Sequence, residues 1–134
     1  MARADSAYYG WGFVGTALHG QFMSRDRACQ AMADLFGCAP SPGALAAMTR
    51  KIADAAAPAV DAVRGALAAA PVAHFDETGF RVAGRLAWVH SASSGKYVLV
   101  TVHERRGKDG MDAAGVLPAF GGIACHNAWA PYDC

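Results

Sequence analysis

Residues 74–82 read HFDETGFRV and place two adjacent carboxylates, Asp76 and Glu77, inside an expected β-strand. The valine and phenylalanine residues around them are typical of strands, and Gly84 offers a turn, so we expect a strand from Val72 to Val82, either continuous or broken around Thr78-Gly79. A carboxylate in a strand is costly unless it is solvated, paired or bound to a cation. From this segment alone, Asp76 either hydrogen-bonds a neighbouring loop or holds a cation.

The segment after Gly84 continues with strand patterns. Two further strands, a short helix and a fourth strand are expected at residues 85–91, 96–103, 109–116 and 122–126. Three consecutive antiparallel strands, a helix and a strand parallel to the first are typical of the opening half of a ribonuclease-H-like fold. The sequence therefore predicts an α/β fold in which the end of the fourth strand lies beside Asp76.

The first half of the chain has helical periodicity. Ser24 is a good N-cap and Gly37 a good C-cap for one helix. Its expected apolar face consists of Ala28, Met32, Leu35 and Phe36. Ser41-Pro42 opens a second helix, which Pro58 should kink by removing one backbone hydrogen bond. These patterns divide the chain into a poorly specified segment, a helical region and a sheet region, at residues 1–23, 24–70 and 71–134.

The two helices allow two interpretations. They could form a helix-turn-helix that binds DNA, with Arg50 and Lys51 on the second helix. They could equally form an ordinary helical hairpin with a solvated basic face. The spacing alone favours the hairpin.

Composition limits the class of protein. The chain has 134 residues, 54% hydrophobic and 17% charged, which suits a packed core in one domain, or in one domain and a fragment of another. A net charge of +1 neither indicates nor excludes a nucleic-acid partner. Four cysteines without a C-x-x-C pair favour reduced thiols and a cytoplasmic setting. The apolar segments are too short or too charged to span a membrane.

Several separated motifs resemble one known family. Residues 74–90, from HFDETGFRV to WVH, resemble the first catalytic block of insertion-sequence transposases of the IS sixty-six type. Further matching elements, in the family's order and spacing, lie at residues 33–37, 41–45, 105–108, 115–122 and 126–132. The resemblance runs from about Gly20 to Tyr132.

The resemblance implies a transposase of the DDE type with a ribonuclease-H-like core. In that chemistry, two aspartates and a glutamate hold two Mg²⁺ ions for DNA strand cleavage and for strand transfer from transposon ends. Asp76 matches the first aspartate, and Glu77 is not a metal ligand by this resemblance. Arg105, Arg106 and Lys108 match a basic element after the third strand. Double-stranded DNA is the implied partner.

Two departures from the family pattern predict a defective catalyst. The family has His-Asp-Gly-Trp where this chain has His126-Asn127-Ala128-Trp129, so the second metal-binding aspartate is replaced by Asn127. The chain is also expected to be truncated before the third acidic residue, and Asp133 lies too near Asn127 to replace it. A half-built sheet should expose one face and one edge, which would favour self-association.

Two other functions stay open at this stage. In one, the helices of residues 24–57 and the basic element with Arg105, Arg106 and Lys108 bind DNA phosphates without catalysis, and binding weakens as salt rises. In the other, the polypeptide has no selected function. His74, His90 and His126 are expected to be ordinary strand histidines rather than catalytic bases. Core packing is favoured over base stacking for Trp88 and Trp129.

Overall fold

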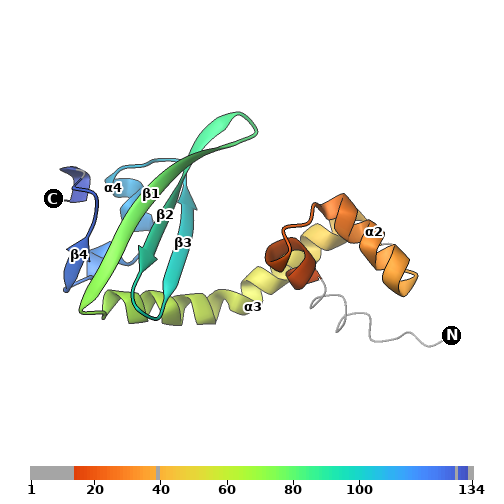
Figure 1. Cartoon of the computed structure of the whole chain (residues 1–134), viewed down its shortest axis with the longest axis horizontal. Coiled ribbons are helices and arrows are strands. Elements are labelled where there is room, and N and C mark those ends of the chain that lie inside the picture. Colours follow the sequence, from red (N-terminus) through yellow and green to blue (C-terminus); the bar gives the residue numbers. More distant parts are fainter. Residues whose placement is uncertain (1–13, 39, 129, 133–134) are drawn as a thin grey trace. The chain divides into compact units, whose positions relative to one another are not determined.

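The computed structural model describes residues 14–38, 40–128 and 130–132 (Figure 1). The chain forms two compact units that meet between Ala57 and Pro58, and each is described by itself. The helices are η1 (Gly15–Gly20), α2 (Arg25–Phe36), α3 (Pro42–Ala68), α4 (Lys108–Ala113), η2 (Leu117–Ala119) and η3 (Ala130–Tyr132). The strands are β1 (Val72–Val82), β2 (Arg85–Ser93), β3 (Val98–His103) and β4 (Ile123–Cys125). Helices followed by a four-stranded mixed sheet confirm the predicted α/β class.

The first unit is helical, and its helix ends follow the sequence signals. The Ser24 hydroxyl accepts a hydrogen bond from the Arg27 backbone N–H at 3.4 Å, and Gly37 ends α2 in the left-handed conformation with φ 64°. The Ser41 hydroxyl likewise accepts from the Ala44 N–H at 3.1 Å at the start of α3. Both predicted caps are confirmed.

The core of this unit is smaller than the sequence pattern predicted. It is formed by Val14, Ala17, Ala28, Met32 and Leu45. Leu35 and Phe36 were expected on the same apolar face but are 67% and 57% exposed, so this part of the prediction is wrong. These two residues lie in the last turn of α2, beyond Met32, the last buried residue of the helix.

The helix α3 continues through Pro58 without interruption. The boundary between the two units falls at this proline, where the helix lacks one backbone hydrogen bond. The kink expected there stays a prediction. The second half of α3 belongs to the sheet unit, because Leu67 is fully buried in the sheet core.

The sheet has the strand order β3-β2-β1-β4. The strands β1, β2 and β3 form an antiparallel meander, and β4 pairs in parallel with β1 from Val72–Ile123 to His74–Cys125. The predicted order and direction of the strands are thereby confirmed. The helix predicted at residues 109–116 is shorter in the structure, because Gly115 takes a left-handed φ of 73° after α4 and a separate turn, η2, follows.

The two faces of the sheet differ in burial. One face carries Ala73 and Phe75 of β1, which pack with Leu67 of α3 and with Val116. Here it is called the covered face. The other, called the open face, exposes alternate residues of β1 and β3: Val72, His74, Asp76, Val98, Val100 and Val102. Among the described helices, none is both long enough and apolar enough to cross a lipid bilayer.

Candidate functional site

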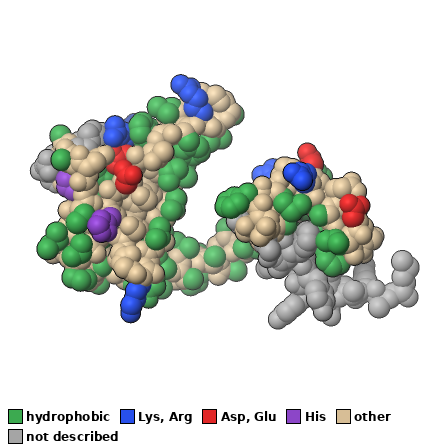
Figure 2. All heavy atoms as spheres, viewed as in Figure 1, with side chains coloured by type: hydrophobic (Ala, Val, Ile, Leu, Met, Phe, Trp, Pro, Cys, Tyr) green, Lys and Arg blue, Asp and Glu red, His purple; other side chains and the backbone are tan. Residues whose placement is uncertain are grey.

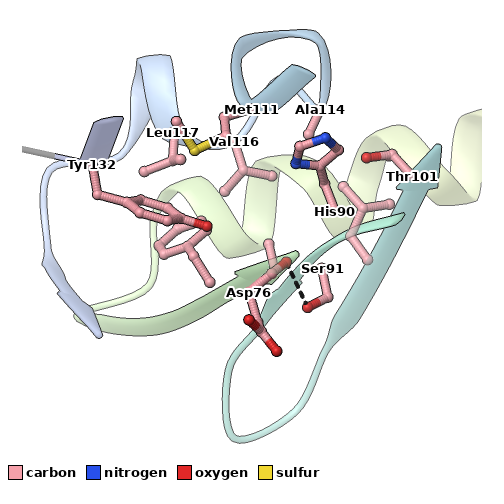
Figure 3. Close-up of a pocket in the computed structure, with 12 residues that line it drawn as sticks. Asp76, His90, Ser91, Thr101, Met111, Ala114, Val116, Leu117 and Tyr132 are labelled. Carbon is pink, nitrogen blue, oxygen red and sulfur yellow. Dashed lines mark hydrogen bonds between the residues drawn. The ribbon is translucent and has the colours of Figure 1, made fainter. Parts of the chain in front are cut away.

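Asp76 lies on the open face in the middle of β1. Burial alternates along the strand, so Asp76 is exposed while its neighbours Phe75 and Glu77 are buried. Asp76 pairs with Ser91 of β2, whose hydroxyl donates to the Asp76 backbone carbonyl at 3.2 Å. Figure 3 shows the Asp76 carboxylate directed away from the Tyr132 ring. The carboxylate is therefore available to solvent or a ligand.

Asn127 follows the strand that runs beside Asp76. The last pair between β1 and β4 joins His74 to Cys125, and both Asp76 and Asn127 stand two residues further along their parallel chains. Asn127 is exposed. The topology thus carries the two positions to the same end of adjacent segments. Their assignment as metal ligands stays a prediction.

The loop after β4 is held in an unusual backbone conformation. Ala128 has a left-handed φ of 58°, and its N–H donates to His126 Nδ1 at 3.1 Å. A left-handed alanine is strained because its Cβ crowds the following carbonyl, whereas glycine adopts this conformation without strain. Glycine would therefore suit this position better than Ala128 does.

Glu77 is buried on the covered face and is fully engaged. Its side chain is 0% exposed. One carboxylate oxygen accepts from Arg106 Nε at 3.1 Å and from Arg106 Nη2 at 2.7 Å, and the other accepts from the Tyr132 hydroxyl at 2.7 Å. A buried carboxylate needs such partners. Glu77 thus anchors two distant segments to β1, as a structural residue and not as a ligand on the open face.

The partners of Glu77 extend this network. The Arg106 guanidinium lies 5.0 Å from the Trp88 ring centroid, and that ring covers Gly79, where an added Cβ would meet it at 3.3 Å. The Tyr132 ring stacks on His126 with centroids 4.5 Å apart. Burial, together with the hydrogen bond to Glu77 and the Glu77 charge, raises the pKa of Tyr132. The sequence analysis did not predict this network, although the sequence shows the adjacent carboxylates Asp76 and Glu77 and a tyrosine, Tyr132, near the end of the chain.

The basic residues predicted to bind DNA have different surroundings. Arg105 forms an ion pair with Asp109, and both side chains are more than 60% exposed. Lys108 is exposed at the first position of α4. Arg106 is directed to Glu77, within the fold. Arg50 and Lys51 are exposed on α3 in the other unit, so no site is built from them together with the sheet residues.

His90 holds the loop after β3 against the sheet. It is 5% exposed, and its Nε2–H donates to the Arg105 carbonyl at 3.1 Å. Gly110 packs directly on this contact, since an added Cβ would lie 2.2 Å from the Arg105 oxygen and 2.5 Å from His90 Nε2. His90 and Thr101 also line the small pocket of Figure 3 between the sheet and Met111. The prediction that His90 is structural agrees with these contacts, and Trp88 packs within the fold. Trp129 lies outside the described residues.

The residues around Asp76 fit only part of a metal site. Carboxylate and amide oxygens are hard donors that suit Mg²⁺. However, Asp76 supplies one negative charge, Asn127 supplies none, and Glu77 is held on the opposite face by Arg106 and Tyr132. Within the ranges that the structure describes, no three His, Cys, Asp or Glu residues gather at one place. This donor set does not fit a two-ion site.

Comparison with known proteins supports one family. The family described as "Transposase IS66 family" matches residues 13–134, which is nearly the whole chain. No curated protein and no solved structure matches the chain. The predicted resemblance is confirmed, and the chain belongs to the IS66 family of transposases.

Proposed function

We propose that this protein binds double-stranded DNA and carries a partial metal-dependent strand-cleavage site centred on Asp76. The observation that carries the proposal is the orientation of the Asp-Glu pair. Asp76 is exposed on the open face, whereas Glu77 is buried on the covered face and is held by Arg106 and Tyr132. Only one carboxylate of the pair can therefore meet a hydrated cation and a DNA phosphate.

The proposed core is ribonuclease-H-like, with the cleavage site at Asp76 and Asn127. The order of the strands and the parallel pairing of β4 with β1 support this proposal. Asn127 should weaken the site, because a neutral amide cannot bridge two cations or offset their charge as a carboxylate does. Strand cleavage and transfer by this polypeptide should consequently be impaired.

DNA would be held through its phosphates. Arg105 and Lys108 are exposed at the loop that leads into α4, and Arg50 and Lys51 are exposed in the helical unit. Phosphate contacts of this kind release counterions, so affinity should fall steeply as salt rises. Arg106 contributes less in this proposal, because its guanidinium already pairs with Glu77.

The test compares wild type with Asn127→Asp. Mg²⁺ or Mn²⁺ is titrated while backbone amide shifts are recorded, and nicking of a supercoiled plasmid is followed in parallel. Asn127→Asp adds a carboxylate near Asp76, which should raise metal affinity roughly tenfold or more. Asp76→Asn is the matched control: in wild type it leaves no carboxylate and should abolish the shifts, and in Asn127→Asp it leaves one carboxylate and should return the affinity to about that of wild type. Equal Mg²⁺ affinity in wild type and Asn127→Asp would refute the placement of the metal site.

A second candidate function is DNA binding without catalysis, as in a regulator derived from a transposase. The amide at Asn127 favours it, because the neutral side chain removes charge from the proposed site without changing the DNA-binding cations. Salt-dependent DNA binding without nicking, even in Asn127→Asp, would support this function over the first. Self-association stays a prediction, and the exposed β3 valines Val98, Val100 and Val102 are the surface on which it would depend.

A further inference from the structure

The hairpin of β1 and β2 extends beyond the rest of the sheet. Pairing between β2 and β3 begins at Trp88 and His103, so residues 80–82 and 85–87 pair only with one another among the described strands. Figure 1 shows this part of the hairpin projecting past β3. The turn at its tip uses Ala83 and Gly84, both with left-handed φ angles of 49° and 81°. The tip is therefore a narrow two-stranded ribbon.

The ribbon has positive charge and no carboxylate of its own, although Glu104 lines the same hollow as Arg85 and Leu86. Arg81 and Arg85 flank the turn, and no Asp or Glu occurs between Glu77 and Glu104. Arg81 donates from Nη1 to the Gly84 carbonyl at 2.9 Å, which keeps its guanidinium at the tip. Figure 2 shows Lys or Arg side-chain atoms near this tip, next to hydrophobic side chains and to backbone.

Two apolar side chains accompany these arginines. Val82 is 55% exposed and Leu86 is 50% exposed, on either side of the turn. Val82 pairs with Arg85, and Arg81 pairs with Leu86, so each face of the ribbon presents one arginine beside one aliphatic side chain. Both faces of the tip thus combine a cation with an apolar contact surface.

We propose that this ribbon is a DNA-binding arm that enters a groove of duplex DNA, with Arg81 and Arg85 on the flanking phosphates. The inference rests on the proposed function, since it assumes that DNA is the partner. A two-stranded ribbon fits the major groove, and arginines that contact phosphates position a protein on the duplex. The charge pattern favours nucleic acid, because Arg81 and Arg85 outnumber the one carboxylate that lines the hollow beside Arg85, Glu104, and a polyanion complements their excess of positive charge.

The arm is placed to hold DNA that flanks Asp76. Asp76 and Val82 lie on the same face of β1, six residues apart. At about 3.3 Å per residue this is about 20 Å. A duplex lying along the strand would therefore meet the tip about six base pairs from a phosphate at Asp76.

The test removes the two charges and measures binding of a fluorescent DNA duplex by anisotropy at about 50 and 200 mM salt. The double variant Arg81→Gln/Arg85→Gln should bind more weakly and lose about two from the slope of log affinity against log salt. Its loss of affinity should be roughly tenfold larger at the lower salt. Lys96→Gln is the matched control, because Lys96 is an exposed cation in the turn at the opposite end of β2.

Each outcome has a separate meaning. Arg81→Lys/Arg85→Lys keeps the charges and should retain most of the wild-type affinity, and amide spectra establish that each variant is folded. If the double glutamine variant binds like Lys96→Gln, the arm is not a DNA contact, while the proposed function stands. If wild type itself binds no duplex at the lower salt, the proposed function fails, and the inference fails with it.

Discussion

The buried ion pair between Glu77 and Arg106 gives the sharpest stability prediction. Arg106→Met removes the guanidinium but keeps an unbranched side chain over Trp88. It leaves the Glu77 carboxylate, 0% exposed, with Tyr132 as its remaining partner within this network. Breaking a buried pair in this way costs about 3–5 kcal/mol. Because the Arg106 side chain is 35% exposed and water can partly replace it, we expect about 3 kcal/mol.

The double variant Arg106→Met/Glu77→Gln distinguishes the cost of an unpaired buried charge from the cost of lost packing. In Arg106→Met/Glu77→Gln no charge is left buried, so its stability should exceed that of Arg106→Met alone by about 1–2 kcal/mol. The free energy of opening is measured from amide hydrogen exchange in β1 and β2, which reports on the sheet unit directly. Arg105→Met is the control, because its ion pair with Asp109 is exposed and should contribute at most about 1 kcal/mol. If Arg106→Met is no less stable than Arg105→Met, Glu77 does not anchor the fold as argued.

Three further predictions concern the contacts around this network. The fold raises the pKa of Tyr132, so its neutral phenol is favoured and the stabilisation is complete below the ordinary tyrosine pKa of about 10. The difference in unfolding free energy between wild type and Tyr132→Phe should therefore be constant below that pH and shrink above it; a pH-independent difference would contradict the cause assigned to the shift. Ala128→Gly should stabilise the protein by about 1 kcal/mol in urea unfolding, because glycine relieves the left-handed φ of 58°, and any destabilisation would count against that strain. Gly110→Ala should destabilise it by about 1–3 kcal/mol in the same assay, because its Cβ would meet the Arg105 carbonyl, whereas Gly95→Ala, with open space around its Cβ, should cost far less.

Local signals predicted most of the fold. Helix caps at Ser24 and Gly37, the turn at Gly84 and the strand from Val72 to Val82 all depend on short-range chemistry, and the structure confirms each. The errors arose where tertiary packing decides. Leu35 has the spacing of a core residue, yet it is 67% exposed, and the core of its unit is formed by other residues.

The candidate site was predictable only in part, for a related reason. The position of Asp76 follows from strand alternation, which is a local property. The role of Glu77 depends on Arg106 and Tyr132, which are 29 and 55 residues away in sequence. A buried carboxylate beside an exposed one can be inferred from alternation, but its partners can be identified only once the fold brings them together.

Asn127 and Ala128, in the loop after β4, have different physical effects, one on charge and the other on the backbone. Asn127 is a neutral, exposed side chain, whereas Ala128 has a left-handed φ of 58° that strains the backbone. The segment that follows is held independently, because Tyr132 bonds to Glu77, stacks on His126 and lies 6.5 Å from the Phe75 ring. The fold of this segment therefore does not depend on which residues occupy positions 127 and 128. Asn127→Asp adds a negative charge but leaves the backbone strained, and Ala128→Gly relieves the strain but adds no charge. The two changes together should therefore raise Mg²⁺ affinity by more than the product of their separate effects.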